Sequence, residues 1–292
     1  MRIKRISGIL IGSTALVVSS FALTSCGGSS IEFKKYSNES TKEEFEKAYA
    51  TFCEEKKTNG YDLTIYDYES EESKSDGKTS KMFGEQTTIE TFDSVSNVLY
   101  RSNKETYEAE APYESESSKV DSEYIYQSDN NLNTIVDLKT KTYSSTAYNA
   151  SASSLKKASI SFGEFIDVNY YQLSNYEKSE AYTIKYYNDS QVYTIAISYD
   201  YTKDKFDEDS NYKVNSMTFD FIFQFYGIDS EYYVGYKTTR SSDVTYTSDS
   251  KTYNYTQKIE TARYARLFNV TQTLEKVDLS GYKKDYSSYA NN

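Results

Sequence analysis

The chain has 292 residues, a formal net charge of −11 and no histidine. Without histidine there is no Ser-His-Asp or Cys-His arrangement and no histidine metal ligation, which disfavours a serine or cysteine hydrolase of the usual kind. The negative charge repels nucleic-acid phosphates and argues against a nucleic-acid partner. Tyrosine occurs 33 times, tryptophan is absent and proline occurs once. Tyrosine at this density favours β-strands with one packed face and one wet face.

The chain opens with a short export-like segment. Three basic residues within the first five positions precede an uncharged, mostly apolar run, residues 9–23, which is too short for a comfortable membrane-spanning helix. The run ends in Leu23, Thr24, Ser25 and Cys26, and a Gly/Ser-rich sequence that is typical of a flexible tether follows. This order of segments resembles a bacterial lipoprotein signal with its lipobox.

The resemblance implies three segments: a signal peptide over residues 1–25, a lipidated Cys26 with a flexible tether over 26–37, and a single β-rich domain over 38–292. The protein would be held at the cell membrane by its lipid and face outward, away from the cytoplasm. Each buried acyl CH₂ contributes about 0.8 kcal/mol, so two chains anchor without a transmembrane helix. Removing three basic residues with the signal lowers the formal charge from −11 to −14. An ordinary secretory signal or an uncleaved anchor helix is the alternative.

An amphipathic helix is predicted directly after the tether. Ser40-Thr41-Lys42-Glu43 has the form of a capping box, and Asn59-Gly60 is expected to end the helix. Apolar residues recur at the spacing of one helical face, and with Cys26 lipidated the second cysteine leaves no intrachain disulfide. The apolar face consists of Phe45, Ala48, Tyr49, Phe52 and Cys53.

Beyond the helix the period changes to two, which predicts consecutive antiparallel strands. Asp76-Gly77 and Asp129-Asn130-Asn131 mark turns between them. The polar stretches 70–81 and 201–210 are predicted as insertions, and charges such as Glu69 are predicted to be exposed and to keep sheet edges from pairing. The predicted strands of this half are residues 63–68, 87–92, 97–102, 105–112, 123–126, 133–138 and 141–143.

Residues 151–173 interrupt the strands with apolar residues at roughly helical spacing, which predicts one or two short helices. Strands then resume at residues 182–186, 193–199, 217–225, 231–239, 244–247, 252–259 and 268–274. The strongest apolar stripe of the chain lies on one face of a single strand. It consists of Met217, Phe219, Phe221, Phe223 and Phe225.

The predicted fold class is α+β and β-rich. We expect one large, curved antiparallel sheet, a half-open barrel, with the N-terminal helix and the short mid-chain helical segment packed on its concave face. The segments that suggest a known arrangement are the helix 41–57, the hairpin 124–143 and the helical stretch 155–165. Their order is similar to that of the LolA/LppX/LprG-like lipoprotein-carrier superfamily. The resemblance implies that acyl chains or lipoproteins are held between sheet and helices, and it transfers no residue with a defined role.

The first functional hypothesis is therefore a non-catalytic binding or carrier lipoprotein that takes a lipid or other hydrophobic ligand. A surface adhesin or structural interaction protein with a filled core is the alternative, and a carbohydrate-active enzyme is the third. No catalytic residue, cofactor or metal site is predicted, and the acidic run 204–209 is interpreted as a solvated loop. The membrane is the predicted partner through the lipid, a hydrophobic ligand is a further one, and the identity of any protein partner is left open. The residues expected to line a ligand cavity or to fill a core are Phe45, Tyr49, Phe52, Met217, Phe219, Phe221, Phe223 and Phe225.

Overall fold

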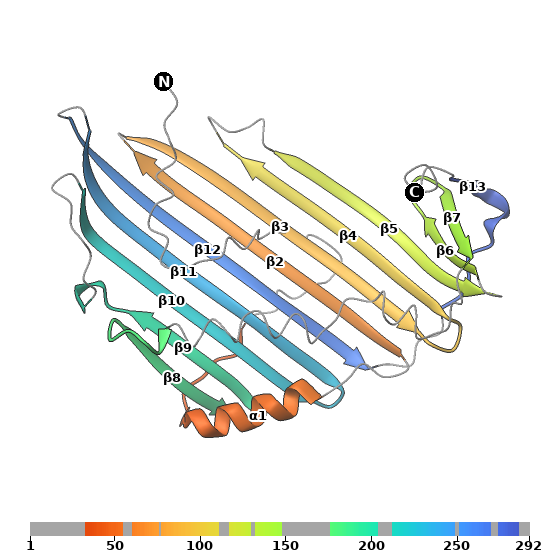
Figure 1. The fold of residues 1–292 in the computed structure, drawn as a ribbon, viewed down its shortest axis with the longest axis horizontal. Coiled ribbons are helices and arrows are strands. Elements are labelled where there is room, and N and C mark those ends of the chain that lie inside the picture. Colours follow the sequence, from red (N-terminus) through yellow and green to blue (C-terminus); the bar gives the residue numbers. More distant parts are fainter. Residues whose placement is uncertain are drawn as a thin grey trace.

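The computed structural model describes residues 33–54, 60–75, 77–110, 117–129, 132–147, 176–203, 212–248, 251–269 and 274–285. All the described strands belong to one broad sheet, with the order β1-β8-β9-β10-β11-β12-β2-β3-β4-β5-β6-β7-β13 (Figure 1). Every pairing is antiparallel except that of β13 with β7. The sheet is open, because β1 and β13 lie at its two edges and do not pair with each other. The β-rich class, the single antiparallel sheet and the N-terminal helix are thus confirmed.

The elements have the following bounds. The α-helix α1 spans Lys42–Glu54, and short 3₁₀ turns follow at Tyr201–Lys203 and Leu279–Gly281. The strands are β1 (Glu39–Ser40), β2 (Gly60–Ser75), β3 (Lys78–Asp93), β4 (Val98–Ala109), β5 (Ser118–Asp129), β6 (Leu132–Asp137), β7 (Thr142–Ala147), β8 (Tyr182–Asp189), β9 (Val192–Tyr199), β10 (Tyr212–Ile228), β11 (Glu231–Ser248), β12 (Lys251–Asn269) and β13 (Lys283–Lys284).

The sheet is built from two consecutive meanders. Strands β2 to β7 pair in chain order, and so do strands β8 to β12. The two meanders join where β12 pairs with β2 along 15 residue pairs, from Tyr255 opposite Ser75 to Asn269 opposite Tyr61. Two-residue strands cap the edges, β1 on β8 and β13 on β7. Short edge strands of this kind leave little unpaired backbone for another chain to pair with.

Tight turns connect the long strands. Asp229 and Ser230 have φ of 48° and 69° and link β10 to β11, and Ser190 and Gln191 have φ of 54° and 68° and link β8 to β9. Two central residues with positive φ are the pattern of a type I′ hairpin turn, whose twist matches that of the flanking strands. These turns fix the register of the second meander.

Several strands are longer than predicted. The two runs 97–102 and 105–112 form one strand, β4, and the runs 231–239 and 244–247 form one strand, β11. The expected insertion at 70–81 is instead the tip of the β2–β3 hairpin, where Ser75 pairs with Lys78. Neighbours on both sides of β2 satisfy its backbone groups, so a polar sequence is held as strand. Of the predicted strand 268–274, residues 268 and 269 belong to β12 and Leu274 is not in a strand, while residues 270–273 lie outside the described part of the chain.

Helix α1 is capped one residue later than predicted, at Thr41 instead of Ser40, and begins at Lys42. The Thr41 hydroxyl accepts a hydrogen bond from the Glu44 backbone N–H at 3.1 Å, and the Glu44 carboxylate accepts one from the Thr41 N–H at 3.2 Å. This is a reciprocal capping box, shifted by one position from Ser40 and Glu43. Ser40 is not free to cap because it is in β1, opposite Tyr186.

Some expectations concern residues outside the described part of the chain. They are the signal and lipobox through Cys26, the helical segment 151–173 and the acidic run 204–209, together with the side chain of Cys53. Within the described ranges, no helix combines the length and the apolar character needed to cross a membrane.

Candidate functional site

The apolar faces of α1 and β10 pack directly on each other. The ring centroid of Phe45 lies 5.1 Å from that of Phe225, Phe52 lies 5.0 Å from Phe225, and Tyr49 lies 5.9 Å from Phe223. All five side chains are at most 7% exposed. At these distances the rings touch, so this part of the interface is a filled aromatic core. We call this side of the sheet the helix face.

The other three residues of the predicted β10 stripe pack against different neighbouring residues. Phe221 belongs to the same core, and Phe219 is half-buried and stacks on Tyr176 at 5.6 Å. Met217 lies in a separate cluster with Val214 and Val244. An irregularity in the β10–β11 register between Val214 and Ser216 brings Val214 and Met217 to one side of the strand. The eight residues predicted as one group thus form two clusters on the helix face.

The opposite face of the sheet carries a segment of the chain that precedes β1. Residues 33–38, which we call the strap, cross β10 and reach the edge of the sheet at β8. The Lys34 N–H donates to the Gln224 side-chain oxygen at 2.8 Å, and the Gln224 amide donates to the Lys34 carbonyl at 3.0 Å. Gln224 alternates with Phe223 and Phe225 along β10 and so points away from α1. We call this side the strap face.

Further contacts hold both ends of the strap. Phe33 meets the Tyr233 ring edge-on, with centroids 6.1 Å apart. At the other end, the Asp189 carboxylate accepts hydrogen bonds from the N–H groups of Ser37 and Asn38. The pKa of Asp189 is lowered because these hydrogen bonds stabilise its charged form. These contacts fix the strap to the strap face of the sheet at both ends.

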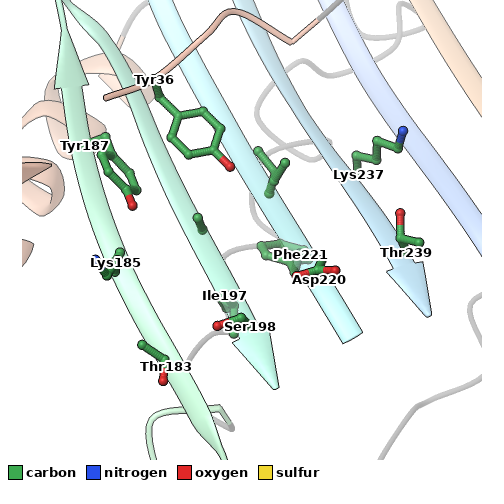
Figure 2. A pocket seen from close by; sticks show the side chains of 12 residues that line it. Tyr36, Thr183, Lys185, Tyr187, Ile197, Ser198, Asp220, Phe221, Lys237 and Thr239 are labelled. Carbon is green, nitrogen blue, oxygen red and sulfur yellow. The ribbon is translucent and has the colours of Figure 1, made fainter. Parts of the chain in front are cut away.

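A pocket of about 470 Å³ lies beside the strap on this face (Figure 2). The tyrosines of the strap and of β8 stand together at one end, where the centroids of Tyr36 and Tyr187 are 4.8 Å apart. Burial raises the pKa of the Tyr36 hydroxyl, and Tyr187 and Asp220 raise it further, so this hydroxyl stays protonated and can donate. The lining residues are Tyr36, Thr183, Lys185, Tyr187, Ala196, Ile197, Ser198, Asp220, Phe221, Ile222, Lys237 and Thr239.

The pairing register arranges the pocket side chains in two rows across β8, β9, β10 and β11. One row is polar and consists of Thr183, Ser198, Asp220 and Thr239. In the second row, Lys185 and Lys237 flank a small apolar floor of Ala196 and Ile222. Because adjacent strands are about 4.8 Å apart, each row spans four strands and places its polar groups at regular intervals. The pocket thus combines an apolar floor and aromatic end with a charged and hydroxylated rim.

The charged groups of the pocket differ in their surroundings. Lys185 is bound by Glu39 of β1, with 2.7 Å between Nζ and Oε1. Within the described part of the chain, Asp220 and Lys237 have no ion pair and no side-chain hydrogen bond. Asp220 is opposite Thr239 and Lys237 is opposite Ile222, so the two charges are diagonal neighbours on adjacent strands. Their Cβ atoms are roughly 7–8 Å apart or slightly less.

Sequence patterns do not single out this pocket. The alternation along β10 does show that Asp220, Ile222 and Gln224 face away from the phenylalanine stripe. However, Tyr36 reaches the pocket only because the strap runs over a sheet face formed almost 150 residues later. The groups of the pocket come from five separate segments, and no local spacing relates them. Among the described residues, no group of histidine, cysteine, aspartate or glutamate side chains is arranged to hold a metal ion.

The helix face carries a buried carboxylate in the middle of the sheet. Asp67 of β2 is 4% exposed, and its Oδ1 lies 2.8 Å from Nε of Arg263 in β12. Burial raises the pKa of Asp67 from 3.8 to about 7, although Arg263 opposes the shift. Glu69, predicted as an exposed edge charge, is half-buried here, because β2 is an interior strand between β12 and β3. Burial raises its pKa as well.

The Asp67 carboxyl is expected to make stability fall as the pH rises. Between about pH 4 and pH 7 the folded state holds a proton on Asp67 that the unfolded state has released, so the free energy of unfolding decreases across this range. The difference between 3.8 and about 7 corresponds to about 4 kcal/mol at most. We expect Asp67→Asn to reduce this slope, measured as the urea midpoint at several pH values. An unchanged slope in Asp67→Asn would contradict the assignment, and Asp229→Asn in an exposed turn is the control.

Comparisons with known proteins identify no family. No protein-family profile and no curated protein matches the chain. Among solved structures, a lipovitellin structure concerned with lipid–protein interactions is 10% identical with a TM-score of 0.31, and the alignment covers 80% of this chain and 28% of lipovitellin. The chain thus spans less than a third of that protein.

Two membrane proteins are similar at a lower level. The outer membrane protein AlkL in DMPC bilayers is 11% identical with a TM-score of 0.19, and 84% of this chain is covered and all of AlkL. A mutant porin of Rh. blastica is 9% identical with a TM-score of 0.16, with coverage of 71% and 100%. TM-scores below 0.5 do not establish a shared fold, so no ligand or assembly is transferred from these proteins.

Proposed function

We propose that the protein is a membrane-anchored, outward-facing bacterial lipoprotein that has no catalytic activity and binds an amphipathic ligand in the strap-face pocket. The observation that carries this proposal is the pocket itself. Its volume of about 470 Å³ is within the range of roughly 300–1,000 Å³ typical of small-ligand sites. Its apolar floor and aromatic end suit a lipid-like portion, and its charged rim suits a polar group.

The helix face is a weaker candidate for the ligand. A cavity there would have to open between α1 and β10, yet Phe45 and Phe52 already touch Phe225. Opening this interface would expose buried aromatic surface to water, which is unfavourable. These contacts support a ligand site on the opposite side of the sheet from the apolar stripe of β10.

The strap also relates the pocket to the proposed anchor. Phe33 is seven residues after Cys26, and an extended chain spans at most about 3.6 Å per residue. The strap would then begin within about 25 Å of the lipid-bearing cysteine, which places the pocket near the membrane surface. A protein in this position can take up or hand over an amphipathic molecule that partitions into the bilayer.

The anchor has its own test. We expect the full chain to be recovered with membranes and to incorporate radiolabelled palmitate when expressed in bacteria. Cys26→Ser should abolish the label, because serine has no thiol to accept the diacylglyceryl group. Labelling that persists in Cys26→Ser would overturn the assignment of the lipid to this residue, whatever the pocket binds.

The ligand site is tested with a fluorescent single-chain phospholipid and the purified lipoprotein in an amphipathic polymer. We expect saturable binding, and we expect Ile222→Trp, which fills the pocket floor, to weaken it about tenfold or more. Ile89→Trp is the matched control, because Ile89 is 38% exposed on the same face but lies in β3, outside the pocket. Equal binding by the wild type and Ile222→Trp would contradict the proposal.

A second function is favoured by the filled core on the helix face. A surface interaction protein needs a solid scaffold rather than a cavity, and the contacts of α1 with Phe223 and Phe225 supply one. Native mass spectrometry of the lipoprotein isolated from cells distinguishes the ligand-binding protein from the surface interaction protein. A co-purifying species of lipid mass, lost on denaturation, supports the binding protein. A clean apo mass that persists after incubation with membrane extract supports the interaction protein.

A further inference from the structure

Two of the three charged side chains that line the strap-face pocket have opposite signs and are not paired with each other. Asp220 projects from β10 and Lys237 from β11, at diagonal positions of the β10–β11 register. The other lysine of the pocket, Lys185, is bound to Glu39 and is less available to a ligand. A ligand in the pocket therefore meets the Asp220 carboxylate and the Lys237 ammonium group on adjacent strands.

The surroundings of these two groups differ in a way that favours complementary ligand groups. Asp220 lies close enough to Tyr36 for its charge to raise the pKa of the Tyr36 hydroxyl. A carboxylate near tyrosine rings is a suitable environment for a ligand ammonium group, which gains both charge attraction and contact with the aromatic faces. Lys237 has the hydroxyl of Thr239 on the same face two residues along β11, and this pair suits a phosphate or carboxylate. The carboxylate of Glu260, opposite Thr239 on β12, is held by Lys258, with 2.7 Å between Nζ and Oε1.

The overall charge of the protein disfavours an anionic ligand. The whole chain carries a formal charge of −11, so an anionic ligand is repelled at long range while a zwitterion is not. We propose that the pocket selects a zwitterionic ligand, with its ammonium group at Asp220 and its phosphate at Lys237, and with any acyl chain along Ala196 and Ile222. This inference rests on the proposed ligand site and names the chemistry of the polar group.

The probes distinguish a free zwitterionic headgroup from a lipid that carries the same headgroup. We would titrate the purified lipoprotein, in the same amphipathic polymer, with free phosphocholine, lysophosphatidylcholine, lysophosphatidylglycerol, dodecyltrimethylammonium and dodecyl maltoside, each below its micellar concentration. We expect lysophosphatidylcholine to bind about tenfold more tightly than the anionic, cationic and non-ionic amphiphiles. Binding of free phosphocholine as well would identify the headgroup as sufficient. If lysophosphatidylcholine binds and free phosphocholine does not, the ligand is a lipid rather than a free headgroup.

Charge-removing variants test the two assigned residues. Asp220→Asn and Lys237→Gln should each weaken lysophosphatidylcholine binding about tenfold, because each removes one charge-assisted contact. Asp220→Asn should affect dodecyltrimethylammonium and leave lysophosphatidylglycerol unaffected, and Lys237→Gln should do the reverse. Asp229→Asn and Lys251→Gln remove the same charges at exposed hairpin positions outside the pocket and should leave binding unchanged.

The outcomes distinguish this inference from the proposed function. If dodecyl maltoside binds as tightly as lysophosphatidylcholine, and Ile222→Trp weakens both, the pocket is a ligand site without zwitterion selectivity and only the further inference is overturned. Unchanged binding in both Asp220→Asn and Lys237→Gln overturns it in the same way. If no amphiphile binds in a manner that Ile222→Trp reduces, the proposed function fails as well.

Discussion

Gly235→Ala is expected to destabilise the protein more than Gly227→Ala or Gly281→Ala. A Cβ at position 235 would lie 2.5 Å from Cβ of Tyr264 and 3.0 Å from the carbonyl oxygen of Arg263. Neither atom can move away by a change of side-chain rotamer, so β11 and β12 would have to shift apart. Overpacking of this kind typically costs about 1–3 kcal/mol and occasionally more.

The reason for the close approach is a stack of tyrosines on the strap face. Tyr226, Tyr233, Tyr264 and Tyr66 come from β10, β11, β12 and β2, with successive ring centroids 5.1, 5.8 and 4.9 Å apart. The Tyr233 hydroxyl lies 2.9 Å from the position that a Cβ of residue 235 would take. Glycine leaves the space into which this ring extends, so the substitution should disturb both the strand pairing and the stack.

Urea unfolding, followed by tyrosine fluorescence, measures the effect against two other glycines. At Gly227 a Cβ would meet ring atoms of Tyr232 at 3.0 and 3.1 Å and of Phe52 at 3.9 Å, all in side chains, and at Gly281 it would meet nothing within 4 Å. We therefore expect the loss of stability to decrease in the order Gly235→Ala, Gly227→Ala, Gly281→Ala, with the last close to zero. A Gly235→Ala protein as stable as Gly281→Ala would show that the tyrosine stack is looser than described.

The fold was predictable where short-range periodicity reports burial directly. The 3.6-residue spacing of Phe45, Tyr49 and Phe52 predicts α1, and the two-residue alternation from Phe219 to Phe225 predicts the buried face of β10. Both follow from side-chain geometry within one element. The polar ends of β2 and β3 were missed because their strand structure depends on pairing with neighbours rather than on apolar alternation. Propensity in strands depends strongly on such context.

The candidate site was much less predictable than the fold. Asp220 and Lys237 become neighbours through the β10–β11 hairpin, whose register the turn at Asp229 and Ser230 fixes. Their meeting with Tyr36 depends on the strap, and nothing in the local sequence of residues 33–38 indicates which sheet face it crosses. The phenylalanine stripe of β10 was expected to line a ligand cavity or fill a core because it is the strongest apolar stripe in the sequence. In the structure this stripe packs against α1.

Phe45→Ala is expected to cost about 3–5 kcal/mol of unfolding free energy, the range for a buried phenylalanine reduced to alanine. Phe45 has no exposed surface, and its ring lies within 6.4 Å of the rings of Tyr49, Tyr186, Phe223 and Phe225. Removing it leaves a cavity between α1 and β10 that these rings cannot all move to fill. Urea unfolding with tyrosine fluorescence measures the loss, and Lys47→Ala on the exposed side of α1 is the control.

The size of the Phe45 effect also decides between the two interpretations of the aromatic stripe. In a filled core, Phe45→Leu should cost less than Phe45→Ala, because leucine leaves a smaller void and loses less buried surface. If α1 were instead a plug that opens to admit a ligand, the contacts of Phe45 would be easily exchanged, and both variants would stay within about 1 kcal/mol of the wild type. The ring distances between α1 and β10 favour the first outcome. A loss below about 1 kcal/mol in Phe45→Ala would return the ligand site to the helix face.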